Sequence, residues 1–132
     1  MTELKLFIAE PGIDDELLED RTQLVRRELL DTDIGDVRLD RSGQVPVGGK
    51  GDPVTVGTLI ISLAGTGAAT AFVSGSLRVL RAFVERRAGR VVIIERGGER
   101  VELKGGSAKE DERLVRQLFP ELPAEGDDGR HP

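Results

Sequence analysis

The chain contains no cysteine, tryptophan or tyrosine, and its single histidine is His131, the second-last of 132 residues. The absence of cysteine excludes disulfide bonds, thiolate metal sites and a cysteine nucleophile, and is typical of a cytoplasmic protein. A serine nucleophile needs a neighbouring base, and no histidine lies in the patterned part of the chain to serve as one. The sequence therefore predicts a protein that is not an enzyme, with no catalytic residues, no cofactor and no metal site.

The remaining polar motifs have simpler explanations than chemistry. The acidic runs Asp14-Asp15-Glu16 and Asp31-Asp33-Asp36 are explained by helix capping and turn formation, and neither has the ligand spacing of a calcium loop. The stretch "GQVPVGGK" (43–50) resembles a phosphate-binding loop, but Gly49 stands where the lysine belongs and no hydroxyl residue follows Lys50. Among the possible functions, nucleotide binding therefore has the least support from the sequence.

Charge is unevenly distributed along the chain. The net charge of −5 argues against nucleic-acid binding. Residues 1–52 carry a net −6, whereas residues 78–104 carry a net +4. This asymmetry has two interpretations: a solvated surface, or a basic patch that contacts an acidic partner such as the N-terminal half of a second copy. The residues of that predicted patch are Arg78, Arg81, Arg86, Arg87 and Arg90.

Hydrophobic periodicity predicts an α+β fold. Four strands are expected over residues 4–10, 37–40, 90–95 and 100–104. Three helices are expected: one from a cap at Asp14 or Asp15 to about Leu30, one over 54–88, and one from the Ser107 cap to Pro120. The order β-α-β-α-β-β-α predicts a two-layer sandwich, with a four-stranded mixed sheet in the order 2-1-3-4 and the helices on one face. Residues 1–119 form this single domain, and 120–132 form an acidic tail that is expected to be disordered.

The least charged segment is "PVTVGTLIISLAGTGAATAFVSGSL" (53–77), which has no charged residue in 25. Its length would allow it to cross a membrane, and arginines follow it. However, 11 of the 25 residues are Gly, Ser or Thr, and a spanning helix would leave too few strands on each side to fold. We expect the buried part of a long helix, with a membrane-inserting segment as the alternative.

Small residues recur every fourth position in that predicted helix, at Gly67, Ala71 and Gly75. Glycine weakens a helix interior by about 1 kcal/mol relative to alanine, so these glycines need a reason. One reason is tight packing on the sheet or on the first helix. The other is a surface for self-association or partner binding along the three residues.

The chain also resembles a known family. A short strand, an acidic helix, "DVRLDR", a Gly/Pro loop and the segment from Gly57 to Gly105, "GTLIISLAGTGAATAFVSGSLRVLRAFVERRAGRVVIIERGGERVELKG", are similar to the effector-associated constant component family of bacterial conflict systems. The similarity covers about residues 4–119 and is best over 54–104. It is a pattern of residue types, without a catalytic signature.

The resemblance implies a non-enzymatic adaptor that couples a sensing component to an effector, for example a caspase-like or trypsin-like peptidase. The partner-binding residues expected from the sequence are Gly67, Ala71, Gly75 and the five arginines of the patch. The edge strand 100–104 could also pair with a partner strand. The expected partners are thus an effector protein and further copies of the chain, in the cytoplasm, without nucleic acid.

Overall fold

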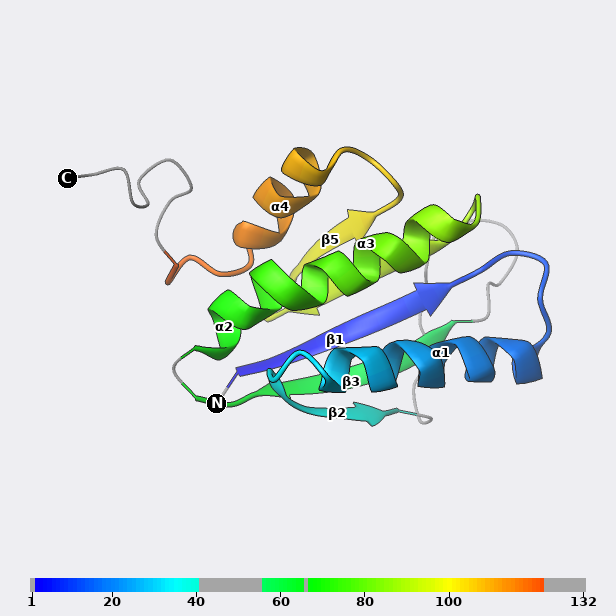
Figure 1. Cartoon of the computed structure of the whole chain (residues 1–132), viewed down its shortest axis with the longest axis horizontal. Coiled ribbons are helices and arrows are strands. Elements are labelled where there is room, and N and C mark those ends of the chain that lie inside the picture. The colour runs from blue at the N-terminus through cyan, green and yellow to red at the C-terminus, as the bar shows by residue number, and fades with distance from the viewer. Residues whose placement is uncertain (1, 41–55, 66, 123–132) are drawn as a thin grey trace.

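A computed structural model describes residues 2–40, 56–65 and 67–122 (Figure 1). The strands are β1 (Thr2–Ala9), β2 (Gly35–Leu39), β3 (Gly57–Leu63), β4 (Val91–Arg96) and β5 (Glu99–Leu103). The helices are α1 (Asp15–Leu30), α2 (Ala68–Ala71), a π-helical segment η1 (Phe72–Ser76), α3 (Leu77–Arg86) and α4 (Ala108–Arg116). The helices lie together on one face of the sheet, so the predicted α+β class is confirmed.

The sheet has five strands in the order β2-β3-β1-β4-β5, and every neighbouring pair is antiparallel. β1 lies at the centre, where Leu6 is in register with Leu59 of β3 and Ile94 of β4. These three side chains are fully buried beneath the helices. The connection β1-α1-β2-β3-α3-β4 with this order is the split βαβ arrangement of ferredoxin-like folds, to which β5 and α4 are added.

The predicted helix over 54–88 was wrong in its first part. Residues 57–63 form strand β3, which lies between β2 and β1, and the helical segment begins only at Ala68. Burial alternates along β3, since Leu59, Ile61 and Leu63 are buried, and this pattern fits a strand with one face on the core. Gly65 then has φ +90°, a left-handed conformation that interrupts the chain before the helix.

The presence of β3 also changes the predicted sheet. The prediction of a four-stranded mixed sheet was wrong, because β3 separates β2 from β1 and makes every neighbouring pair antiparallel. The four predicted strands keep their relative order around the inserted one. No helix in the described ranges is long and apolar enough to cross a membrane. The Gly/Pro loop and most of the predicted tail lie outside the described residues.

The predicted helix caps are confirmed. Asp14 Oδ1 accepts a hydrogen bond from the Leu17 backbone N–H at 2.9 Å. Ser107 Oγ accepts one from the Glu110 N–H at 3.1 Å. Each side chain thus satisfies a backbone donor that has no partner within the helix.

Candidate functional site

A π-helical turn interrupts the helix that runs from Ala68 to Arg86. The turn, Phe72–Ser76, brings Ser76 against the end of α1, where its buried hydroxyl lies 2.8 Å from the Thr32 hydroxyl. Thr32 in turn donates to the Leu29 carbonyl oxygen at 2.6 Å. Single π turns are rare and frequently mark functional positions in helices, because they change which side chains face outward.

An ion pair fixes α4 beside this helix. Asp111 on α4 is 3% exposed, and its Oδ2 accepts from Arg81 Nη1 of α3 at 2.5 Å. The same Arg81 nitrogen donates to the Gly106 carbonyl oxygen at 3.0 Å, and its other terminal nitrogen pairs with Glu85. Arg81 therefore holds the start of α4 at a fixed distance from α3.

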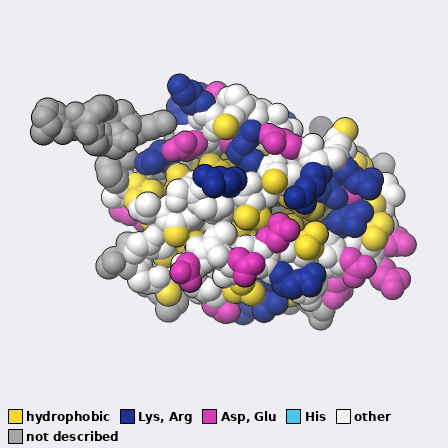
Figure 2. Space-filling view, in the orientation of Figure 1, with side chains coloured by type: hydrophobic (Ala, Val, Ile, Leu, Met, Phe, Trp, Pro, Cys, Tyr) yellow, Lys and Arg dark blue, Asp and Glu magenta, His cyan; other side chains and the backbone are white. Residues whose placement is uncertain are grey.

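The space left between the two helices is a groove, which we call the helix groove. Its volume is about 460 Å³, within the range of ligand-binding clefts. Figures 1 and 2 view the molecule from the helix side, where α3 and α4 lie next to each other. The groove is lined by Thr70, Val73, Ser74, Leu77, Arg78, Arg81, Ala108, Glu112, Arg116 and Leu122.

The helix groove combines an apolar wall with a basic rim. The buried residues Val73 and Leu77 form the apolar wall. On the rim, Arg116 lies 3.2 Å from Glu112, and Arg81 is paired as above. Arg78 is exposed and forms no ion pair within the described part of the chain. The rim thus presents a guanidinium that an acidic group of a partner could approach next to an apolar surface.

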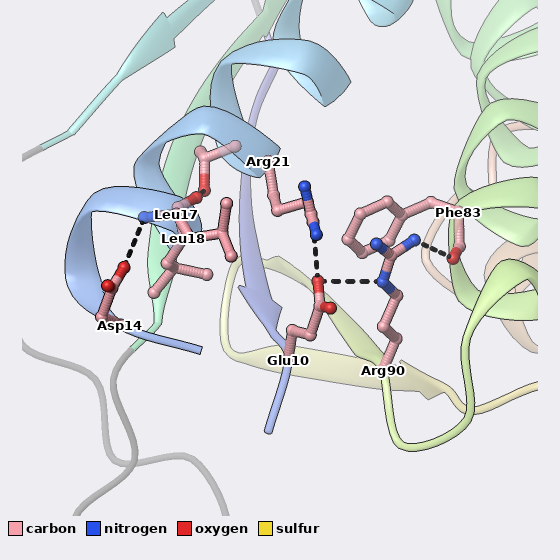
Figure 3. Close-up of polar contacts among 8 residues, drawn as sticks. Glu10, Asp14, Leu17, Leu18, Arg21, Phe83 and Arg90 are labelled. Atoms are coloured by element: carbon pink, nitrogen blue, oxygen red, sulfur yellow. Dashed lines mark hydrogen bonds and ion pairs between the residues drawn. The ribbon is translucent and has the colours of Figure 1, made fainter. Parts of the chain in front are cut away.

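The predicted arginine patch is divided by the structure. Arg90 is only 6% exposed, and its Nε donates to Glu10 Oε1 at 3.0 Å while Nη1 donates to the Phe83 carbonyl oxygen at 2.9 Å (Figure 3). Its guanidinium also lies over the Phe83 ring, 4.0 Å from the centroid. Arg21 Nε binds the same Glu10 oxygen at 3.1 Å. Arg90 therefore links α3, β4 and the end of β1 inside the molecule.

The other two patch residues, Arg86 and Arg87, are exposed where α3 ends. Figure 2 shows basic side chains gathered at that end of the molecule, with acidic side chains nearby. Arg86 and Arg87 lie outside the helix groove, whereas Arg78 and Arg81 line it. The five arginines of the predicted patch therefore occupy three different environments.

The row of small residues does not follow one helical face. Gly67 is exposed and precedes α2, Ala71 packs against the core, and Gly75 lies in the π turn. A Cβ atom built on Gly75 would lie 3.6 Å from Thr32 Cβ, an ordinary contact with the end of α1. The glycine is thus where the helix meets α1, and a small side chain has room there.

Among the described residues no three acidic or histidine side chains come together as a metal site. No family model, curated protein or solved structure matches this chain. Sequence reasoning identified Arg78 and Arg81 of the groove but missed its α4 side, Ala108, Glu112 and Arg116. Their helix was predicted, but no pattern in the sequence indicates which helices lie next to each other.

Proposed function

We propose that the protein is a non-enzymatic adaptor that binds a segment of an effector protein in the helix groove. The observation that carries the proposal is the exposed Arg78, which has no ion-pair partner among the described residues and lies beside the apolar wall formed by Val73 and Leu77. A groove of this kind suits an amphipathic partner segment, whose apolar side enters the groove while an acidic side chain pairs with the arginine.

The side-chain contacts around the groove support this role. The Arg81–Asp111 pair and the Ser76–Thr32 contact set the positions of both walls before any partner arrives. A preformed site loses less conformational entropy on binding than a mobile one. The resemblance to the effector-associated family adds the context, a bacterial conflict system in which the effector would be a caspase-like or trypsin-like peptidase.

The test compares two charge reversals in affinity capture from the native host. Arg78→Glu changes the groove rim, whereas Arg27→Glu changes an exposed arginine on α1, away from the groove. We expect wild type and Arg27→Glu to capture the same effector, and Arg78→Glu to lower its affinity at least about tenfold. Equal capture by both variants, or a captured set without any effector-type protein, would reject the proposal.

A further inference from the structure

The two edge strands of the sheet differ in how open their outer sides are. Directly after β2, the backbone N–H of Asp40 donates to the Thr58 carbonyl oxygen at 2.9 Å, so Asp40 has its backbone groups toward β3. Because this direction alternates along a strand, Val37 has its backbone groups pointing away from β3. Arg26 on α1 donates from Nε to that outward Val37 carbonyl oxygen at 2.7 Å. A side chain therefore occupies the middle of this edge, and such obstruction prevents further strand pairing.

β5 forms the other edge without such an obstruction. It is joined to β4 by a two-residue turn, Gly97–Gly98, whose positive φ values of 57° and 106° fit a hairpin turn. Arg96 and Glu99, which flank this turn, form a hydrogen-bonded pair, as residues next to a two-residue hairpin turn do. Hydrogen-bonded and non-hydrogen-bonded pairs alternate along the ladder, so the backbone groups of Arg100 and Glu102 point away from β4. In the described residues no strand or side chain is bonded to those outward groups.

The side chains on this edge alternate in charge. Arg100 and Glu102 are exposed, with side-chain accessibilities of 43% and 46%, and both stand on the face of the sheet opposite the helices. Arg100 lies 3.1 Å from Glu95 on the neighbouring strand. An incoming strand would therefore meet a positive charge and a negative charge two residues apart.

We infer that β5 pairs with β5 of a second copy of this chain, antiparallel about a two-fold axis at Val101. In this register Arg100 of each copy faces Glu102 of the other, so both charges are complemented twice. A shift by two residues in one direction would oppose Glu102 to Glu102, and in the other direction Arg100 to Arg100. Like charges directly opposite each other are destabilising, so the charge pattern favours one register and a second copy as the occupant.

This inference goes beyond the proposed function, because no residue of β5 lines the helix groove. Pairing would join two sheets edge to edge and leave the groove of each copy available. An adaptor of this form would present two effector sites, and two sites raise the effective concentration of one bound effector near another.

The experiment measures dimerisation by sedimentation velocity from about 1 µM to 1 mM chain. We expect wild type to dimerise, and Arg100→Glu or Glu102→Arg to weaken the dimer at least about tenfold, since the symmetry axis places each repulsion twice. An equimolar mixture of the two variants should regain dimerisation, because opposite charges then meet in every pair.

Two further variants separate pairing from folding. Arg38→Glu, a matched reversal on the other edge strand, should leave dimerisation unchanged, and Glu102→Pro should abolish it by removing an outward N–H while far-UV circular dichroism stays native. The inference is overturned if wild type stays monomeric throughout, or if folded single variants dimerise as well as wild type. It is equally overturned if the mixture regains nothing.

Discussion

Glu10 joins three parts of the fold through one carboxylate oxygen. Its side chain is 4% exposed and accepts from Arg90, at 6%, and from Arg21, at 23%. A buried charge is tolerated only when it is paired and hydrogen-bonded, because its transfer from water is costly. No buried side-chain nitrogen or oxygen in the described residues lacks a hydrogen-bond partner, so this group is internally satisfied.

Removal of the Glu10 carboxylate should therefore strongly destabilise the fold. We expect Glu10→Ala to lower the free energy of unfolding by about 3–5 kcal/mol, because it leaves the buried Arg90 guanidinium without its anion. Glu3→Ala is the matched control, since Glu3 and Arg38 form an exposed pair at 3.7 Å and its loss should cost less than about 1 kcal/mol. Urea unfolding followed by circular dichroism measures both, and similar losses for the two variants would contradict the buried-pair account.

A second arginine holds the chain that follows α4. Arg96 Nη1 donates to Glu121 Oε1 at 3.0 Å and also to the Leu118 carbonyl oxygen, and its guanidinium lies 5.0 Å from the centroid of the Phe119 ring. The hydrogen bond from Arg96 is the main reason that the pKa of Glu121 lies below its ordinary value. The folded protein therefore favours the ionised carboxylate more than the unfolded chain does.

This lowered pKa sets the sign of a pH effect. The contribution of Glu121 to stability is fully present above the ordinary carboxyl pKa and is lost as the pH falls through the lowered pKa. Since Glu121 is 46% exposed, we expect wild type to exceed Glu121→Gln by under about 1 kcal/mol at neutral pH. Urea unfolding over a pH series should show this difference vanish in acid, and a difference that grows in acid would contradict it.

Among the secondary-structure elements, β3 is the one whose type the sequence did not predict. An uncharged run that continues without a break into the periodic segment around Leu77, Leu80 and Phe83 is compatible with one long helix. The alternation of Leu59, Ile61 and Leu63 was present, but Ile60 between them is also apolar and obscured it. Pairing with β1 and β2 on both sides decides the strand, and pairing between distant segments is not encoded in local periodicity.

Gly57, the first residue of β3, distinguishes strand from helix by the sign of one substitution. A Cβ atom there would lie 2.0 Å from Thr22 Oγ1 on α1, so we expect Gly57→Ala to destabilise the fold by about 1–3 kcal/mol. In a helix interior the same change would stabilise by about 1 kcal/mol. Thermal or urea unfolding gives the sign, and a stabilised Gly57→Ala protein would contradict the strand.

Two further variants test the contact between residue 57 and Thr22 directly. Thr22→Ala in the Gly57→Ala background removes the nearest atom and should restore part of the loss. Gly67→Ala is the control without a clash, because nothing lies within 4 Å of its Cβ position and its φ is −98°. Since Gly67 is the N-cap of α2, we expect only the capping cost of alanine, about 1 kcal/mol or less. A loss at Gly67 as large as that at Gly57 would indicate a general backbone effect instead of a clash with α1.

The candidate site was predictable in part at this scale. Arg78 and Arg81 were predicted as partner-binding residues because they belong to the basic segment that follows the uncharged run. The different environments of Arg81 and Arg90 were not predictable, because their partners Asp111 and Glu10 are 30 and 80 residues away in sequence. The π turn was also missed, and the contact that it brings about, between Ser76 and Thr32, joins residues 44 positions apart in the sequence.

In the whole molecule, the two surfaces that we propose for binding lie on different parts of the fold. Its helix side carries the helix groove, and its β5 edge carries the alternating charges proposed to join two copies. The charge asymmetry of the sequence corresponds only partly to the surface, because some of the basic residues are paired inside the fold. Of the five arginines in the predicted patch, Arg78, Arg86 and Arg87 are exposed and form no ion pair within the described residues.

Site-specific photo-crosslinking in the native host shows whether the helix groove receives the effector. A photoreactive residue at Ser74, in the groove, is compared with one at Arg27, an exposed position on α1 outside it. We expect mass spectrometry to find an effector segment joined at position 74 and not at position 27. Crosslinking of the effector at 27, with none at 74, would contradict the proposal.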